Sequence, residues 1–434
     1  MTINDATAAY IRQHTEHDVR QLALQGTKNP EIDLPFALDQ IAGRQTARHK
    51  LPSWAATDGI IYPPHLSMEQ CSSELTARYK GEMLLDGATN GFRFTDLTGG
   101  FGVDFVGIVQ WLMSRSAPST TPQTFPSVLT YVERQEHLCA IARTNLKLLG
   151  LGHAEVVCAD AEEYLRAMSG VDFIYIDPAR RDSHGSRTYG ISDCTPDVCA
   201  LLPLLLSKSR RVLLKLSPML DWRKAVSDLG SEFVREVHIV SVQNECKELL
   251  VLMESPPATS RSEVRLVCAN IVKAGELQRF EYSYPLSKTT GNYPLSIASG
   301  NQPPLSSFWG GEVLVCYLYE PNASIMKAGC FAEVACRYSV APIAANSHLF
   351  ASEQLVNDFP GRVFAVTDVT TMNKRELKSK LGSLSQANIT VRNFPLSVAD
   401  LRRRLKLSEG GSTYIFATTL ANGDKVLLIC KRIS

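Results

Sequence analysis

The chain has 434 residues, of which 44% are hydrophobic and 21% charged, and its 45 Lys and Arg residues nearly balance its 44 Asp and Glu residues. This length predicts roughly two to four domains and permits a large buried core. The net charge of +1 excludes a uniformly basic nucleic-acid coat and a polyacidic tail, so any basic surface must be local. The longest apolar stretch, near residues 198–206, is too short for a membrane helix, and the N-terminus lacks a secretory pattern. We therefore expect a cytosolic protein.

The cysteines are isolated from one another. All 11 occur singly between Cys71 and Cys430, with no C-x-x-C pair and no Cys/His spacing typical of a metal site. This pattern indicates buried thiols in a reducing compartment rather than a disulfide framework. We expect no bound metal.

Residues 1–90 are expected to form a mainly helical N-terminal region. Charged and apolar positions recur at helical spacing in residues 10–26 and 34–51, and again in residues 67–85 after a Gly/Pro interruption at residues 58–64. Ser73 is a candidate N-cap for the last of these helices.

Residues 91–255 contain short β-rich segments that alternate with helical ones. This alternation predicts an α/β domain around a parallel, doubly wound sheet. The last two segments are joined only by residues 243–247, which are too few for a helical crossover, so we expect an antiparallel hairpin at the sheet edge. The Ser/Thr/Pro-rich residues 116–127 indicate a surface insertion. The expected strands lie near residues 92–98, 128–133, 154–160, 172–178, 211–218, 237–242 and 248–254.

Two smaller modules are expected after a linker at residues 256–262. Residues 256–345 are predicted to form a β-rich domain, with strand-like segments at 264–272 and 311–320. Residues 346–434 read as strand, helix, strand, helix and a final hairpin that turns at Asn422 and Gly423. This order predicts a compact α+β module.

The most informative segment is FTDLTGGFGVD, at residues 94–104, where a strand ends at Asp96 and a helix follows. Glycines let a backbone approach a ligand closely, and a helix N-terminus supplies amide donors. Phe105 replaces the third glycine of a dinucleotide fingerprint, and Asp96 would repel a pyrophosphate. Both features favour S-adenosylmethionine, whose ammonium group is attracted by a carboxylate, over NAD. The candidate cofactor-binding residues here are Asp96, Thr98, Gly99, Gly100 and Gly102.

Two further acids follow the next strand ends. Glu133 ends the second expected strand, where it can accept hydrogen bonds from both ribose hydroxyls of the cofactor. Asp160 ends the third, where it can accept from the adenine amino group. Each acid alone is typical of a solvated loop. Because the carboxyl ends of parallel strands meet at one crevice, the three acids together predict a cofactor site.

These segments resemble class I S-adenosylmethionine-dependent methyltransferases. The resemblance is carried by DLTGGFGVD, by Glu133 with its following helix, and by IDPAR at residues 176–180. The whole chain is similar to a bacterial subgroup that has a small ferredoxin-like insert and a C-terminal THUMP-like domain, through segments at 72–80, 317–329 and 393–407. This resemblance implies an α/β fold with a Rossmann-like sheet of five parallel strands plus an antiparallel edge hairpin. A helical N-terminal region and C-terminal α+β modules would flank this sheet.

The fourth expected strand ends in the sequence Asp-Pro-Ala-Arg, at the position that holds the acceptor nitrogen in amino methyltransferases. A carboxylate or carbonyl there can accept a hydrogen bond from an amine and align its lone pair for transfer. Asp177, Pro178 and Arg180 are therefore catalytic candidates, with Asp177 orienting the acceptor. An adenine-directed enzyme usually has an aromatic residue in place of Arg180. An arginine can instead stack on a base, hold a phosphate or form a salt bridge at the rim.

The Asp-Pro-Ala-Arg sequence also resembles that of uracil C5-methyltransferases, which attack the base with a cysteine. Those enzymes carry the thiol just after the fifth strand, where this chain has the Lys-Leu-Ser-Pro of residues 215–218. Cys246 is the nearest replacement, and a hairpin cysteine is more often structural. We therefore expect direct transfer to nitrogen or oxygen. Lys215 can steer a phosphate or pair with a neighbouring acid.

The C-terminal module has a local excess of positive charge. Residues 372–406 contain nine Lys and Arg residues and two acidic residues, a net charge of +7. This excess is typical of phosphate-backbone binding, or else of a solvated helix face, since three consecutive arginines cannot all point one way. The resemblance to THUMP-type domains, which bind RNA in tRNA-modifying enzymes, favours structured RNA. The candidate contacts are Arg392, Arg402, Arg403, Arg404 and Lys406.

Three functions are compatible with these features. The leading hypothesis is a methyltransferase that modifies structured RNA, either tRNA or rRNA. The second is an RNA-binding or assembly factor with a methyltransferase fold that no longer uses the cofactor. The third is a methyltransferase that acts on protein or on a small molecule.

Overall fold

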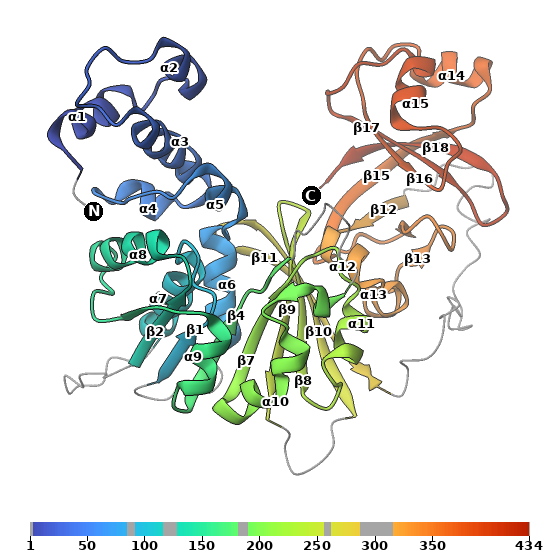
Figure 1. The fold of residues 1–434 in the computed structure, drawn as a ribbon. Helices are drawn as coiled ribbons and strands as arrows, with labels where there is room; N and C mark the ends of the chain where they lie inside the picture. The colour runs from blue at the N-terminus through green and yellow to red at the C-terminus, as the bar shows by residue number, and fades with distance from the viewer. Residues whose placement is uncertain are drawn as a thin grey trace. The chain divides into compact units, whose positions relative to one another are not determined.

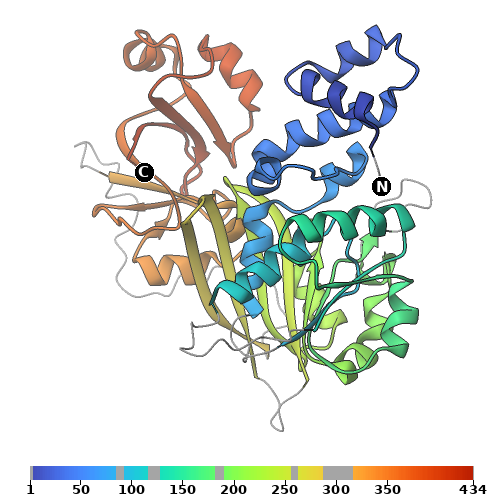
Figure 2. The same cartoon turned by 90° about the vertical axis from the view of Figure 1, so that its left-hand side faces the viewer.

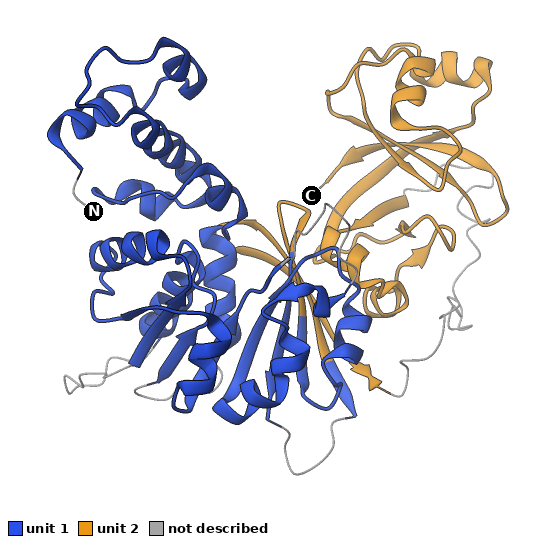
Figure 3. Cartoon of the chain, in the orientation of Figure 1, with its two compact units in different colours: residues 1–237, 248–264 blue, residues 238–247, 265–434 orange. Residues whose placement is uncertain are grey.

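The computed structural model describes residues 3–84, 92–115, 128–180, 190–255, 262–286 and 316–433. The chain divides into two compact units, the first comprising residues 1–237 and 248–264 and the second residues 238–247 and 265–434 (Figure 3). The expected insertion at residues 116–127 lies outside the described residues, as does all of the expected linker except Ser262. No helix in the described ranges combines the length and apolar character needed to cross a membrane.

The N-terminal part of the first unit is helical, as the sequence predicts (Figure 2). The long helix α3 is central, because α1, α2, α4 and α5 all pack against it. Asn4, Asp18 and Asp33 cap the first three helices by accepting backbone N–H bonds. Ser73 caps α6, since its Oγ accepts from Thr76 N at 3.2 Å. The helices are α1 (Asp5–His14), α2 (Val19–Gln25), α3 (Leu34–Lys50), α4 (Pro52–Ala56), α5 (His65–Gln70) and α6 (Glu74–Leu84).

A nine-stranded sheet contains all seven strands expected between residues 92 and 254 (Figure 1). Its order is β11-β10-β8-β9-β7-β4-β1-β2-β3, and neighbours from β3 to β7 are parallel, which confirms the five parallel strands. Strand β9 pairs antiparallel with β7. The strands are β1 (Arg93–Asp96), β2 (Val128–Glu133), β3 (Glu155–Cys158), β4 (Val171–Ile176), β7 (Ser209–Leu216), β8 (Val234–Val242), β9 (Glu245–Glu254), β10 (Glu263–Lys273) and β11 (Glu276–Pro285).

The expected hairpin joins β8 and β9 through a tight turn at Gln243 and Asn244, whose φ angles are 49° and 65°. Positive φ at both central residues suits a two-residue hairpin turn. The hairpin does not end the sheet, because β10 and β11 follow it. Sequence analysis assigned β10 to the next domain and did not indicate β11.

Helices connect the parallel strands. They follow β1, β2, β3 and β7 in chain order, and one more precedes β7. The connection from β4 to β7 also holds a two-stranded ladder in which Ala179 pairs with Thr195 and Arg180 with Cys194. These elements are α7 (Val103–Arg115), α8 (Glu136–Leu148), α9 (Ala161–Ala167), β5 (Ala179–Arg180), η1 (Ile191–Asp193), β6 (Cys194–Thr195), α10 (Val198–Lys208) and α11 (Trp222–Asp228).

The second unit contains a seven-stranded sheet in the order β13-β14-β12-β15-β18-β17-β16. From β15 onward the elements follow the strand, helix, strand, helix, hairpin order that the sequence predicts. Alternate residues of the final hairpin belong to two apolar clusters, and α14 and α15 contribute to one of them. Both helices therefore cover the same face of this sheet. The elements are β12 (Cys316–Pro321), α12 (Ala323–Ala328), α13 (Phe331–Tyr338), β13 (Ala341–Pro342), β14 (Phe350–Ser352), β15 (Gly361–Thr370), α14 (Lys374–Leu381), β16 (Asn388–Arg392), α15 (Val398–Leu405), β17 (Thr413–Thr419) and β18 (Lys425–Arg432).

Candidate active site

One cavity of about 240 Å³ lies at the carboxyl ends of the parallel strands in the first unit. Its lining includes all four acids that the sequence analysis selected at strand ends: Asp96, Glu133, Asp160 and Asp177. Strands β1, β2 and β4 pair in parallel, so their carboxyl ends lie at one edge of the sheet. The predicted convergence of these acids on one crevice is therefore present in the structure.

The glycine loop also lines this cavity, through Thr98, Gly99, Gly100 and Gly102. A Cβ atom on Gly99 would lie 2.1 Å from the ring of Tyr131, so only glycine fits there. Gly100 and Gly102 have φ angles of 56° and 89°, which disfavour other residues. The Thr98 hydroxyl accepts from Asp177 N at 2.7 Å and ties the loop to the end of β4.

Asp96 is buried in the wall of the cavity. Its Oδ1 accepts from Thr98 N at 2.9 Å, whereas its Oδ2 is buried without a hydrogen-bond partner among the described residues. Burial raises the pKa of Asp96 well above its usual value. A buried oxygen that lacks a donor is suited to receive one from a ligand, and a cationic donor would also stabilise the carboxylate.

Backbone N–H groups already donate hydrogen bonds to the carboxylates of Glu133 and Asp160. Glu133 accepts from Gly100 N at 3.0 Å and Gln135 N at 2.9 Å, which fixes its carboxylate beside the glycine loop. Asp160 is the exposed N-cap of α9, and its Oδ1 accepts from Glu162 N at 2.8 Å and Glu163 N at 3.3 Å. The lone pairs that remain on each carboxylate can accept from hydroxyl or amino groups of a ligand.

Asp177 forms an ion pair with Lys215 inside the cavity, with Oδ2 and Nζ 2.6 Å apart. Of the two roles considered for Lys215, pairing with a neighbouring acid is the one that the structure shows. Pro178 is buried and is not part of the cavity lining, whereas Ala179 is. The side chain of Arg180 lies outside the described part of the structure.

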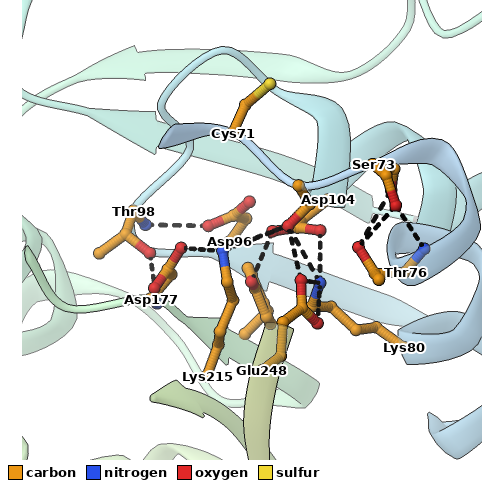
Figure 4. A network of polar contacts seen from close by, with 12 residues as sticks. Cys71, Ser73, Thr76, Lys80, Asp96, Thr98, Asp104, Asp177, Lys215 and Glu248 are labelled. Carbon is orange, nitrogen blue, oxygen red and sulfur yellow. Dashed lines mark hydrogen bonds and ion pairs between the residues drawn. The ribbon is translucent and has the colours of Figure 1, made fainter. Parts of the chain in front are cut away.

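Behind this ion pair lies a buried network that sequence analysis did not identify (Figure 4). Lys80 Nζ lies 2.9 Å from Asp104 Oδ1 and 2.7 Å from Glu248 Oε2. Ser72 Oγ lies within 3.2 Å of Lys215 Nζ and donates to Asp104. The sequence offers no local signal for this network, because Ser72 precedes the helix that carries Lys80, and Asp104 and Glu248 belong to α7 and β9.

A cysteine lines the cavity, but it is not the one considered from the sequence. Cys71 is part of the lining, and Cys246 is not. Burial raises the pKa of the Cys71 thiol, and its Sγ donates to Met68 O at 3.2 Å. A protonated, buried thiol is a poor nucleophile. Within the described ranges, no group of His, Cys, Asp and Glu residues is arranged to hold a metal ion.

Comparisons with known proteins agree with this architecture. A family model described as THUMP domain-like matches residues 361–432, and one described as a ferredoxin-like domain matches residues 317–360. A solved structure of a protein described as a methyltransferase, from Porphyromonas gingivalis W83, is 30% identical and aligns over 100% of both chains with a TM-score of 0.78.

Two other solved structures are similar over part of the chain. A protein described as a class I S-adenosylmethionine-dependent methyltransferase, from Listeria monocytogenes, is 10% identical over 63% of this chain and 95% of that chain, with a TM-score of 0.39. TrmN from Thermus thermophilus is 18% identical over 43% of this chain and 51% of that chain, with a TM-score of 0.30. The comparison with curated proteins found no match.

The sheet order, the glycine loop and the cavity at the strand ends define a class I methyltransferase. The chain belongs to the family of class I S-adenosylmethionine-dependent methyltransferases that also carry a ferredoxin-like and a THUMP-like domain, and it is similar to the Porphyromonas gingivalis protein over its whole length. The predicted fold class and family are thereby confirmed.

Proposed function

We propose that this methyltransferase transfers the methyl group of S-adenosylmethionine to a nitrogen or oxygen of structured RNA, without a covalent cysteine intermediate. The observation that carries the proposal is the single cavity in which Asp96, Glu133 and Asp160 lie together with Asp177. The raised pKa of the Cys71 thiol, which disfavours the nucleophilic thiolate, supports direct transfer.

The residues present fit the cofactor. The free oxygen of buried Asp96 would receive the ammonium group, Glu133 the ribose hydroxyls and Asp160 the adenine amino group. The positive φ angles of Gly100 and Gly102 let the backbone pass close to the ligand. When bound, the cofactor supplies a methyl group already activated on a sulfonium. Positioning of the acceptor is then the main task of the protein.

Replacing Asp96 by Asn is expected to weaken the binding of S-adenosylhomocysteine about 10- to 100-fold at pH 7, because a charge-assisted hydrogen bond is lost. Burial raises the pKa of Asp96, and the ammonium group binds the ionised form. The affinity of the unmodified protein should therefore rise with pH above about 4, and this rise should disappear in Asp96→Asn. Calorimetric titration between pH 5 and 7, where the ligand ammonium group stays protonated, measures both effects.

Glu133→Gln is the matched control for this prediction. It removes a carboxylate that faces the ribose rather than the cation, so affinity should fall while its rise with pH persists. An unchanged pH profile in Asp96→Asn would show that Asp96 does not contact the ammonium group.

The nine basic residues between residues 372 and 406 of the THUMP-like domain divide into two groups. Four of them have acidic partners: Lys380 pairs with Asp368, Arg392 with Glu320, Arg402 with Glu409, and Arg403 with Asp400. The other five are exposed and have no acidic partner among the described residues. They lie on or next to α14 and α15, which cover one face of the sheet (Figure 1). These five residues are Lys374, Arg375, Lys378, Arg404 and Lys406.

We infer that these five form the RNA-binding surface, and we call them the free basic residues. Of the five contacts expected from sequence, this surface retains Arg404 and Lys406. Arg392, Arg402 and Arg403 are instead engaged in ion pairs. A cation already paired with a carboxylate adds less attraction for a phosphate.

Replacing Lys378 and Arg404 together by Gln is expected to weaken RNA binding at low salt. The magnitude of the slope of log affinity against log salt should fall by about 1.4 to 1.8, the range for two lost phosphate contacts in single-stranded and double-stranded segments. Binding of a fluorescent RNA at several salt concentrations measures the slope. Arg403→Gln, which removes a cation paired with Asp400, is the matched control and should leave the slope nearly unchanged. Equal slopes in the unmodified protein, the double variant and Arg403→Gln would show that α14 and α15 are not part of the RNA-binding surface.

Transfer of tritium from labelled S-adenosylmethionine tests the proposed function as a whole. Total RNA and total protein from a strain that lacks this enzyme serve as parallel acceptors, because their target sites are unmodified. Label in RNA supports the proposal. Label only in protein, or in neither, would refute RNA as the substrate.

A further inference from the structure

The acceptor end of the cavity places a carboxylate and an ammonium group side by side. Asp177 Oδ2 accepts from Lys215 Nζ at 2.6 Å, and both residues line the cavity. The Asp177 side chain is 36% exposed and the Lys215 side chain 13% exposed. Among the described residues, no donor contacts the other oxygen of Asp177. That oxygen is therefore free to accept a proton from a substrate.

The surrounding network keeps Lys215 positively charged (Figure 4). Its Nζ lies 3.7 Å from Asp104 Oδ2 and 3.2 Å from Ser72 Oγ. Burial alone would lower the pKa of Lys215, but the carboxylates of Asp177, Asp104 and Glu248 more than offset this and raise it. The lining of the cavity therefore carries a positively charged lysine at neutral pH.

This fixed cation distinguishes between two kinds of methyl acceptor. An exocyclic amine gains positive charge as its nitrogen is methylated, so a neighbouring ammonium group opposes the reaction. A hydroxyl loses its proton and gains negative charge on oxygen. It needs a proton acceptor, and a cation beside the oxygen stabilises the developing charge. A free carboxylate oxygen next to a buried lysine supplies both the proton acceptor and the cation.

The sequence at the end of β4 agrees with a hydroxyl acceptor. An enzyme that methylates a flipped adenine usually has an aromatic residue three positions after the aspartate, where it stacks on the base. This chain has Arg180 at that position. In RNA, the hydroxyl found at every nucleotide is the ribose 2′-hydroxyl.

We propose that the acceptor is a ribose 2′-hydroxyl of RNA, with Asp177 as the proton acceptor and Lys215 as the cation that stabilises the oxygen. This inference rests on the proposed function. The hydroxyl proton moves to the free oxygen of Asp177, and a lone pair of the hydroxyl oxygen forms the new bond to the methyl carbon. The bond from that carbon to the donor sulfur breaks, and its electron pair stays on sulfur. The products are a methyl ether, a neutral thioether and a protonated Asp177, which then releases its proton to water.

The position of the label in RNA tests this proposal with the unmodified protein. A 2′-O-methyl group blocks alkaline cleavage of the adjacent phosphodiester, because that cleavage requires the free 2′-hydroxyl. After transfer of tritium into RNA from a strain lacking this enzyme, alkaline hydrolysis should leave the label in resistant dinucleotides. Label in mononucleotides would place the methyl group on a base and overturn the proposal. Absence of label from RNA would instead refute the proposed function itself.

Variants of Lys215 test the role of the cation. Lys215→Met should slow single-turnover transfer by on the order of a hundredfold, with the affinity for S-adenosylhomocysteine retained. Lys215→Arg, which keeps the charge, should recover part of this loss. Lys224→Met removes an exposed lysine that pairs with Asp228 and should leave the rate unchanged. An unchanged or faster rate in a folded Lys215→Met protein would show that the cation does not assist transfer. If that variant fails to fold, the alkaline hydrolysis result alone decides the acceptor.

Discussion

Replacing Asp177 by Asn is expected to lower the rate of methyl transfer by about 10²- to 10⁴-fold while S-adenosylhomocysteine still binds. The amide has nearly the shape of the carboxylate, but it cannot take up a proton and does not form an ion pair with Lys215. The carboxylates of Asp96 and Glu133, which we assign to the cofactor, are unchanged. Single-turnover transfer of label to RNA measures the rate, and calorimetric titration measures the affinity.

Asp58→Asn is the control for this comparison, because the Asp58 side chain is 99% exposed and is not part of the cavity lining. It should match the unmodified protein in both measurements. A normal rate in Asp177→Asn would place the proton acceptor elsewhere. A parallel loss of affinity would assign Asp177 to the cofactor rather than to the acceptor.

The strand-end acids could be predicted because their signal is local. Asp96, Glu133 and Asp160 each follow a β-rich segment directly, and the alternation of strands and helices fixes where such positions meet. The hairpin formed by β8 and β9 could also be predicted, from the shortness of the connection. The continuation of the sheet into β10 and β11 was not, because an apolar strand pattern does not reveal which sheet the strand joins.

The buried network could not be predicted in the same way. Lys80 and Glu248 are 168 residues apart in the sequence, and a lysine on an amphipathic helix is normally exposed. Only the folded chain brings together the partners that make its burial possible. Arg392 shows a second limit of prediction from the sequence. It was expected to contact RNA, and the structure shows it paired with buried Glu320, 72 residues away. A local excess of charge does not reveal which cations are already neutralised.

The network separates the two lysines into different roles. Lys215 reaches the cavity, whereas Lys80 is fully buried and does not line it. Lys80 neutralises Asp104 and Glu248 from behind, so that these acids can hold Lys215 without an excess of buried negative charge. Lys80 is thus a positioning residue, and its loss should first be visible as a loss of stability.

Replacing Lys80 by Met is expected to lower the free energy of unfolding by about 3–5 kcal/mol, the cost of leaving a buried charge without its partner. Glu248 is only 4% exposed and would lose its cation. Urea denaturation followed by fluorescence measures the change. Lys224→Met, at an exposed pair, is the control and should leave the free energy of unfolding nearly unchanged.

The pH dependence of this loss identifies its cause. Burial alone would raise the pKa of Asp104, but Lys80 and Lys215 hold it well below its usual value. The stabilisation from this ionised carboxylate is therefore present above pH about 4 and is lost as the pH falls towards the lowered pKa. The deficit of Lys80→Met should be largest near pH 7 and should shrink towards pH 4, where the unpaired acids take up protons.

The double variant Lys80→Met, Glu248→Gln should lose less stability than Lys80→Met alone, because one unpaired charge is removed. An equal deficit at all pH values would mean that the loss comes from poorer packing of the methionine side chain rather than from the missing charge.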